Sequence, residues 1–203
     1  MRRGSGNGER GAGRTARNPP SRRPAVLSGS AVLALLLILA ARPADAQSRL
    51  TQEEALRLAF PGAVVERQTA FLTAAQVEAV RGRAGPGAAP PPAVVTWYRA
   101  RKDGAEAGSA WFDAHRVRTH SEVLMVVVGP DRTVRRVELL RFDEPPDYRP
   151  PAGWLALFGG RALADLGRGS VPPLTGATLT ADAVGRAVRR SLALEAVVRG
   201  GGE

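Results

Sequence analysis

Residues 122–142 read EVLMVVVGPDRTVRRVELLRF, and this stretch decides the fold. Residues 122–128 form a continuous, largely β-branched run, Gly129-Pro130-Asp131 is a turn sequence, and a second run covers residues 134–142, so the stretch predicts a β-hairpin. Because strand side chains alternate, neither face of the second run is cleanly apolar. One face would hold Val134, Arg136, Glu138 and Leu140, and the other Arg135, Val137, Leu139 and Arg141. We therefore expect this strand to be partly exposed on both sides.

Two more strands are predicted immediately upstream. Short apolar and aromatic runs at 93–101 and 110–119 are separated by residues 102–104, which contain the Asp-Gly turn signal. His115 and His120 are the only histidines, and five residues apart on one strand they would point to opposite faces, which argues against a metal site built on them. The sequence thus predicts an α+β fold, with a small antiparallel sheet packed with helices and a C-terminal amphipathic helix.

Helical signals precede these strands. Residues 51–54 (TQEE) and 73–76 (TAAQ) have the spacing of capping boxes and predict two short helices, ending near Gly62 and Gly82. Residues 85–92 contain only Gly, Pro and Ala, a composition typical of a linker. We expect residues 47–92 to be a helical segment with this linker, followed by a domain at 93–198.

The region after the hairpin predicts a turn and two helices. Residues 143–148 (DEPPDY) leave the sheet as a rigid acidic turn, and an apolar helix follows at 154–158. All three Trp residues are expected in the core, because large aromatic side chains are usually buried. The last helix is expected at 181–198, with an apolar stripe that docks on the sheet. Its polar side holds Arg186, Arg189 and Arg190, which form either a solvated face or a contact for a partner or acidic lipid.

The stretch 174–180 (LTGATLT) lies immediately before that last helix. Gly176 and its small neighbours let backbone N–H groups approach an anion, and the positive end of the following helix favours negative charge there. This arrangement indicates a site for a phosphate ester. The alternative is structural: Gly176 makes a turn and Thr180 caps the helix.

Thr175-Gly176-Ala177-Thr178 resembles the Ser/Thr-Gly-Ala-Thr hallmark of the FMN-binding domain family, which includes extracytoplasmic flavin subunits of Rnf-type and sodium-translocating NADH:quinone oxidoreductase complexes. The resemblance extends over about residues 120–195, from the 122–142 hairpin through Glu144, Trp154 and Phe158. It implies that a flavin transferase moves FMN from FAD onto Thr178 as a phosphoester.

The resemblance also implies the other cofactor-binding residues. These are Thr175, Gly176, Ala177, Leu179, Thr180 and, from a Glu-x-Pro-like loop near the flavin, Glu144. One departure is that the family commonly has an acidic residue about three positions before the Ser/Thr, where this chain reads VPPL at 171–174. Noncovalent FMN, or a flavin-free module of the same fold, therefore remain alternatives.

The N-terminal region has the order of a secretory signal peptide. Arg22 and Arg23 precede an apolar run at 31–41, and Ala44-Asp45-Ala46 fits the small-residue rule for cleavage, so we expect residues 1–46 to be removed. An uncleaved membrane anchor is the alternative. Either reading places the domain outside the cytoplasm, in the periplasm or at the outer face of the cytoplasmic membrane.

Composition excludes several classes of function. The net charge is +10, but residues 1–46 hold eight Arg against Glu9 and Asp45, a net +6, and no nucleic-acid motif is present. The absence of Cys excludes disulfides, iron–sulfur clusters and thiolate metal sites. The Gly-x-Gly-x-x-Gly spacing at residues 6–11 lies in the predicted leader and follows no predicted strand, so it does not suggest a nicotinamide substrate. No Gly-x-Ser-x-Gly elbow supports an esterase.

The predicted function is therefore that of an exported flavoprotein that relays electrons between redox partner proteins, possessing no catalytic residues or metal ligands of its own. A membrane oxidoreductase complex is one such partner, and a flavin transferase is needed for maturation. The flavin would supply the redox chemistry and the protein its setting. The alternative, from a different class, is a flavin-free exported structural or binding module.

Overall fold

The computed structural model describes residues 50–167 and 169–200. The expected signal peptide, with the anchor as its alternative, lies outside these residues. None of the helices in the described ranges is long and apolar enough to cross a bilayer.

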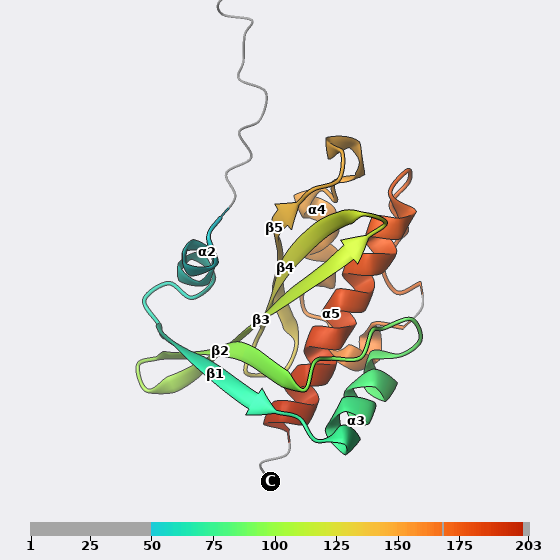
Figure 1. The fold of residues 1–203 in the computed structure, drawn as a ribbon. Helices are drawn as coiled ribbons and strands as arrows, with labels where there is room; N and C mark the ends of the chain where they lie inside the picture. Colours follow the sequence, from blue (N-terminus) through green and yellow to red (C-terminus); the bar gives the residue numbers. More distant parts are fainter. Residues whose placement is uncertain (1–49, 168, 201–203) are drawn as a thin grey trace, which may run out of the picture. The chain divides into compact units, whose positions relative to one another are not determined.

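The described chain folds as five antiparallel strands and surrounding helices, which confirms the α+β prediction (Figure 1). The strands lie in the order β1-β2-β3-β4-β5, so each pairs with its neighbour in sequence. Their bounds are β1 Val64–Phe71, β2 Val94–Lys102, β3 Ala105–Val117, β4 His120–Val128 and β5 Val134–Phe142. The helices are α2 Gln52–Ala59, α3 Ala74–Ala84, α4 Ala152–Leu155 and α5 Thr178–Arg199, with single 3-10 turns at Pro146–Tyr148, Ala156–Phe158 and Leu163–Asp165.

The predicted capping boxes are confirmed in both early helices. Thr51 and Glu54 exchange hydrogen bonds at the start of α2, and Thr73 and Gln76 do so at the start of α3. The segment 64–71 between them forms β1, a strand that the sequence did not predict, and it pairs with β2 along its whole length. The described residues consequently cluster as one compact unit.

The sheet has an apolar layer on each face, because alternate residues of β4 point to opposite sides. Leu124, Val126 and Val128 pack beneath α3, α4 and α5, together with all three Trp residues. Met125 and Val127 pack on the other face against α2. The helix α5 thus covers one face and α2 the other (Figure 1). The predicted burial of the Trp residues is confirmed.

Strand β5 is bulged, and its predicted division into faces is wrong. Its pairing with β4 leaves one extra residue at Arg135 and another at Leu140. Each bulge resets the alternation of side chains. As a result, four apolar side chains of β5 reach the core beneath α5: Val134, Val137, Leu139 and Phe142.

The two histidines lie on different strands, which corrects their predicted placement. His115 is on β3 and His120 is the first residue of β4, across the turn at Arg118 and Thr119. Arg118 has a positive φ of 53°, as such a tight reversal requires. His115 therefore points toward the α5 face, where its environment is described below.

Gly108 sets the close approach of β3 to β4. Its φ is +135°, and a Cβ built on it would lie 2.4 Å from the carbonyl oxygen of Val128. Gly82 in α3 offers a contrast, because its φ lies outside the left-handed region and no atom lies within 4 Å of a Cβ built on it.

We expect Gly108→Ala to destabilise the protein by about 2 kcal/mol or more, because it adds backbone strain and a clash with β4. Gly82→Ala is the matched control and should be neutral or stabilising by up to about 1 kcal/mol, since Ala is the better helix former. Urea unfolding of both variants measures the difference. Equal stabilities would show that β3 can move away from β4.

Candidate functional site

The Thr-Gly-Ala-Thr sequence lies at the N-terminus of α5. The helix begins at Thr178, three residues before the predicted start, and Ala177 is its N-cap residue without a side-chain capping hydrogen bond. Thr180 is buried within the first turn, so the alternative in which it caps the helix is wrong. A helix start without a side-chain cap leaves its N–H groups to other acceptors, and its dipole favours an anion.

Thr178 is exposed at this helix start, whereas Ala177 and Thr180 are buried. Gly176 has a φ of +82°, and nothing lies within 4 Å of a Cβ built on it, so the backbone turns through open space there. The hydroxyl of Thr178 is consequently accessible from solvent, and that of Thr180 is not.

A cavity of about 220 Å³ adjoins this loop, lined by residues 176–180 together with Arg118, Glu144 and Tyr148. The structure therefore brings Glu144 to the Thr-Gly-Ala-Thr loop, although the two are more than thirty residues apart in the sequence. The hydroxyl of Thr180 lies 3.4 Å from Oε1 of Glu144 and points toward it. Thr175 is exposed beside the cavity but does not line it.

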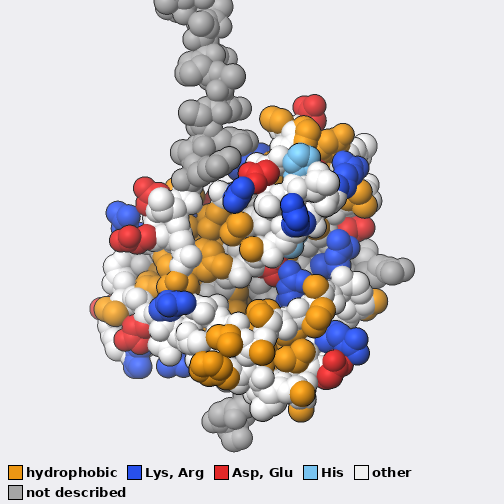
Figure 2. Space-filling model, in the orientation of Figure 1, with side chains coloured by type: hydrophobic (Ala, Val, Ile, Leu, Met, Phe, Trp, Pro, Cys, Tyr) orange, Lys and Arg blue, Asp and Glu red, His pale blue; other side chains and the backbone are white. Residues whose placement is uncertain are grey.

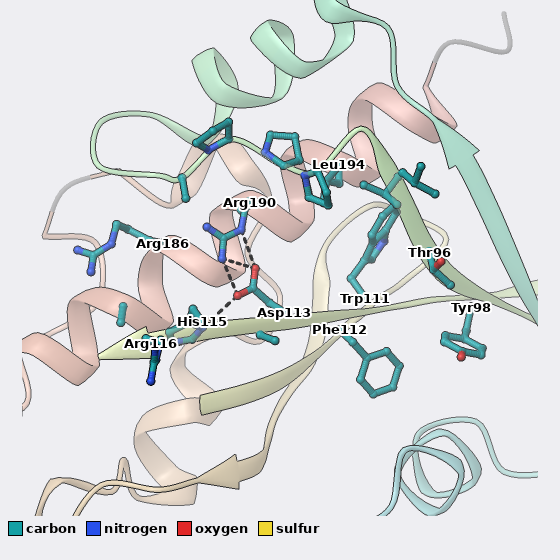
Figure 3. Close-up of a pocket in the computed structure, with 18 of the residues that line it drawn as sticks. Thr96, Tyr98, Trp111, Phe112, Asp113, His115, Arg116, Arg186, Arg190 and Leu194 are labelled. Atoms are coloured by element: carbon teal, nitrogen blue, oxygen red, sulfur yellow. Dashed lines mark hydrogen bonds and ion pairs between the residues drawn. The ribbon is translucent and has the colours of Figure 1, made fainter. Parts of the chain in front are cut away.

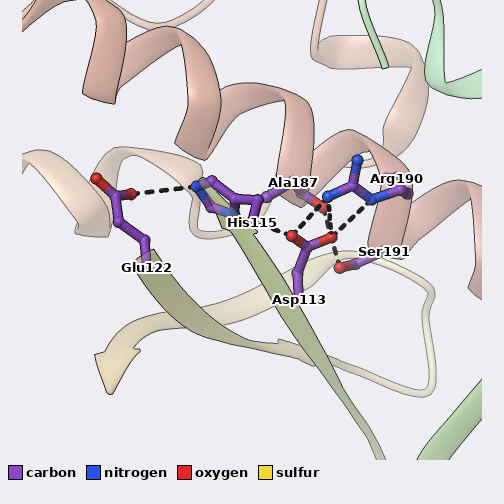
Figure 4. A network of polar contacts seen from close by, with 6 residues as sticks. All are labelled: Asp113, His115, Glu122, Ala187, Arg190 and Ser191. Carbon is purple, nitrogen blue, oxygen red and sulfur yellow. Dashed lines mark hydrogen bonds and ion pairs between the residues drawn. The ribbon is translucent and has the colours of Figure 1, made fainter. Parts of the chain in front are cut away.

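A line of buried polar groups continues from this cavity across the interface between α5 and the sheet. Behind Glu144 lies Glu122, which is fully buried. Its Oε2 is 3.1 Å from Nε2 of His115, and Nδ1 of His115 is 3.0 Å from Oδ1 of Asp113 (Figure 4). Arg190 of α5 then donates to both oxygens of Asp113, with Nε at 2.7 Å from Oδ2.

His115 is positively charged at neutral pH in this setting. Burial alone lowers its pKa, but hydrogen bonds to Asp113 and Glu122 and the charges of both carboxylates outweigh burial and raise the pKa to about 9. For Asp113, burial raises the pKa, but His115 and Arg190 together hold it below its ordinary value. The imidazolium thus bridges two carboxylates that are otherwise excluded from water.

The environment of Glu144 shifts its carboxyl toward the neutral acid, because its pKa is raised. Burial is the main cause of its raised pKa, and the negative charge of Glu122 raises it further. Arg118 and His120 act in the opposite direction but do not outweigh them. Oε1 of the buried Glu122 makes no hydrogen bond within the described residues.

Sequence reasoning missed most of this polar line. Asp113 was visible as the single acidic residue of the 110–119 run and Glu122 as the acidic first residue of the apolar 122–128 run, and an acid in a strand that is expected to be buried signals a buried partner. Arg190 was assigned to a polar helix face, yet its side chain is only 13% exposed and is paired with Asp113. The sequence argued against His115 as a metal ligand but suggested no other role. In the structure His115 of β3 contacts Glu122 of β4 and so links these two strands. The described ranges contain no cluster of three such groups placed to hold a metal ion.

Chemically, the loop combines an accessible hydroxyl, an anion-favouring helix start and a nearby guanidinium from Arg118. These are the groups that a phosphate ester needs. Glu144 adds a carboxyl with a raised pKa at the wall of the same cavity. No protein-family model and no curated protein sequence matches the chain.

The charged state of His115 predicts a pH-dependent stability. Its pKa in the folded protein, about 9, exceeds the ordinary value of 6.5, so its contribution is complete below about pH 6.5 and is lost as the pH rises through 9. We expect the free energy of unfolding to fall by up to about 3 kcal/mol over this window.

His115→Gln should flatten this dependence, because glutamine does not titrate, while His120→Gln should retain it. Urea unfolding at pH 6.5 and pH 9.5 measures both. The same pH dependence in wild type and His115→Gln would contradict the assignment of a charged imidazolium.

Proposed function

We propose that this protein is an exported flavoprotein that carries FMN as a phosphoester on Thr178 and relays electrons between redox partners at the outer face of the cytoplasmic membrane. The proposed export is inferred from the leader sequence. The proposed FMN attachment is inferred from the resemblance of residues 175–178 to the FMN-binding domain family. Maturation would require a flavin transferase.

The observation that supports the proposal most is the setting of Thr178. Of the three Thr residues in the stretch, Thr180 is buried, while Thr178 is exposed at the first turn of α5 and lines the cavity that Glu144 also lines. Thr175 is exposed but lies outside the cavity lining. An acceptor must be reachable by a modifying enzyme and must leave the phosphate in a favourable field, and Thr178 meets both requirements.

The charges around the cavity suit a phosphate diester. The N-terminal end of α5 and Arg118 provide positive potential. Glu144 would oppose an anion if it were ionised, but its raised pKa favours the neutral carboxyl. A neutral Glu144 could donate a hydrogen bond to a phosphate oxygen, while its Oε1 accepts one from the hydroxyl of Thr180.

The size of the cavity limits what it holds. At about 220 Å³ it is smaller than the roughly 300–1,000 Å³ typical of pockets that enclose a whole cofactor. It therefore suits the phosphate end, and the remainder of the cofactor would lie beyond it, near the half-exposed Leu179. A bound flavin supplies one- and two-electron redox chemistry, and a location outside the cavity leaves it within reach of partner proteins.

The transfer of FMN from FAD to Thr178 is a phosphoryl transfer, so it needs no oxidant or reductant. The hydroxyl oxygen of Thr178 would form a bond to the phosphorus on the riboflavin side of FAD, the pyrophosphate bond would break with AMP as the leaving group, and the hydroxyl proton would be released. The first-turn N–H groups of α5 would stabilise the negative charge of the product.

The alternative is a flavin-free exported module of the same fold. The sequence VPPL at 171–174, which lacks the acidic residue that the family commonly has there, favours it. Such a protein would be colourless after purification from a host with an active transferase.

The deciding experiment is intact-mass and visible-absorption measurement of the protein, produced with its own leader in a host that has a flavin transferase. We expect wild type to gain the mass of FMN less one water and to absorb visible light. Thr178→Ala should abolish both, because Thr180 is buried and Thr175 lies outside the cavity lining, whereas Thr178→Ser should retain them.

Thr175→Ala is the matched control, since Thr175 is also exposed and belongs to the same motif, but would not be esterified. It should keep the added mass, even if the yield falls. Unmodified, colourless wild type beside a fully flavinylated control protein would reject the covalent proposal and favour the flavin-free module.

A further inference from the structure

A second and larger cavity lies on the α5 side of the molecule, between β2 and β3. Its volume is about 1,010 Å³, and its walls are the first residues of β2, the second half of β3, the Pro-rich loop at 90–92 and the middle of α5 (Figure 3). We call it the β2–β3 slot. Neither the flavin site nor its chemistry uses it.

The slot exists because β2 and β3 separate. Their pairing runs from the Lys102–Ala105 end only as far as Trp97 opposite Trp111. Beyond that point β2 continues to Val94 while paired with β1, and β3 continues to Val117 while paired with β4. Residues 112–117 of β3 thus pair with β4 on one edge and with no strand on the other. Within the described chain, no backbone hydrogen bond from a turn or loop is made to these six residues either.

An unpaired strand edge inside a sheet is a template for another strand. Six residues at about 3.4 Å each give an edge of about 20 Å, which matches a short extended peptide. Val94 at the mouth of the slot is 49% exposed, and Tyr98 and Phe112 add aromatic surface. These groups supply apolar contacts for alternate side chains of such a peptide.

The slot is strongly cationic. Four Arg side chains and His115 line it, and Asp113 is its one acidic lining residue among those described. Asp113 is already neutralised by Arg190 and His115. Arg67, Arg116 and Arg186 form no ion pair within the described ranges, and Figure 2 shows Lys or Arg side chains beside apolar ones on the face that it draws.

The cations flank both faces of the open edge. Arg186 approaches from α5. Arg116 lies on the opposite face of β3, the face of Phe112, because it is four residues further along the strand. Arg67 lies on that face too, because it is paired with Tyr98, which packs in the cluster beneath α2. Acidic side chains on either side of an added strand would therefore meet a guanidinium.

We infer that the β2–β3 slot binds an acidic, extended peptide segment of a partner protein, which adds to β3 as an antiparallel or parallel strand. Charge argues against the two nearest competitors. Residues 1–46 of this chain carry a net +6, and a second copy of this chain would bring the same set of Arg side chains to a slot that is already cationic. The inference does not depend on the flavin, so failure of either proposal leaves the other standing.

The test uses the full chain and a fluorescein-labelled octapeptide of alternating Glu and Val, with binding measured by fluorescence anisotropy. We expect saturable binding with a dissociation constant below about 1 mM. The same peptide with Lys in place of Glu should not bind. A version with N-methylated amides along one edge keeps the charges but cannot pair as a strand, and it should also fail.

Arg116→Glu combined with Arg186→Glu should weaken binding by about tenfold or more, since each reverses a charge on one face of the slot. Arg57→Glu, on the exposed side of α2 and outside the slot, is the matched control and should change binding less than about twofold. Hydrogen exchange should slow at the amides of residues 112–117 when the acidic peptide is bound.

Several outcomes would overturn the inference. Absence of binding by the acidic peptide would reject it, and equal binding of the N-methylated peptide would reject strand addition. Dimerisation through the slot, seen in sedimentation and lost in the double variant, would assign the slot to a second copy. Tighter binding of anionic lipid vesicles or single-stranded DNA, also lost in the double variant, would assign it to those ligands.

Discussion

The buried carboxylates between α5 and β3 are the constraint on which the rest of the structure depends. Asp113 and Glu195 both lie in this interface, and a carboxylate excluded from water must be paired to be tolerated. Arg190 reaches Asp113 from α5, while Glu195 of α5 accepts hydrogen bonds from Ser109 and Trp111 of β3, each at 2.7 Å. These two sets of polar contacts, at Arg190 and at Glu195, therefore fix both the rotation of α5 about its axis and its position along β3.

That fixed position determines the geometry of the Thr-Gly-Ala-Thr loop. Because α5 cannot slide, its first turn is held beside Glu144, and Thr178 remains at the surface while Thr180 is buried. The same helix brings Arg186 to the β2–β3 slot near its middle. One element thus positions an anion-favouring end and a cationic wall, at two separate cavities of the molecule.

The sequence predicted the elements better than it predicted their contacts. Capping boxes, the 122–142 hairpin and the α+β class follow from local patterns, which is why they were predictable. Strand β1 was missed because its apolar residues, at 64–65 and 70–71, do not alternate with polar ones, and it is a strand largely because β2 offers it hydrogen bonds. The predicted division of β5 into two faces was wrong because the bulges at Arg135 and Leu140 have no sequence signature of their own.

Of the candidate site, the sequence motif indicated the Thr-Gly-Ala-Thr loop, and the family resemblance added Glu144. The line of polar groups through Glu122, His115 and Asp113 depends on strand register, which no local pattern specifies.

The stacked pair of Trp97 and Trp111 has a consequence for how this protein can be observed. Their rings are 5.4 Å apart and inclined by 12°, at the last paired position before β2 and β3 separate. Two indoles so close and nearly parallel share their electronic transitions, and the near-ultraviolet circular dichroism of the pair depends on their mutual orientation. The circular dichroism of this Trp pair therefore reports on the point where β2 and β3 separate. It would show, without an added label, whether the gap between the two strands widens or narrows.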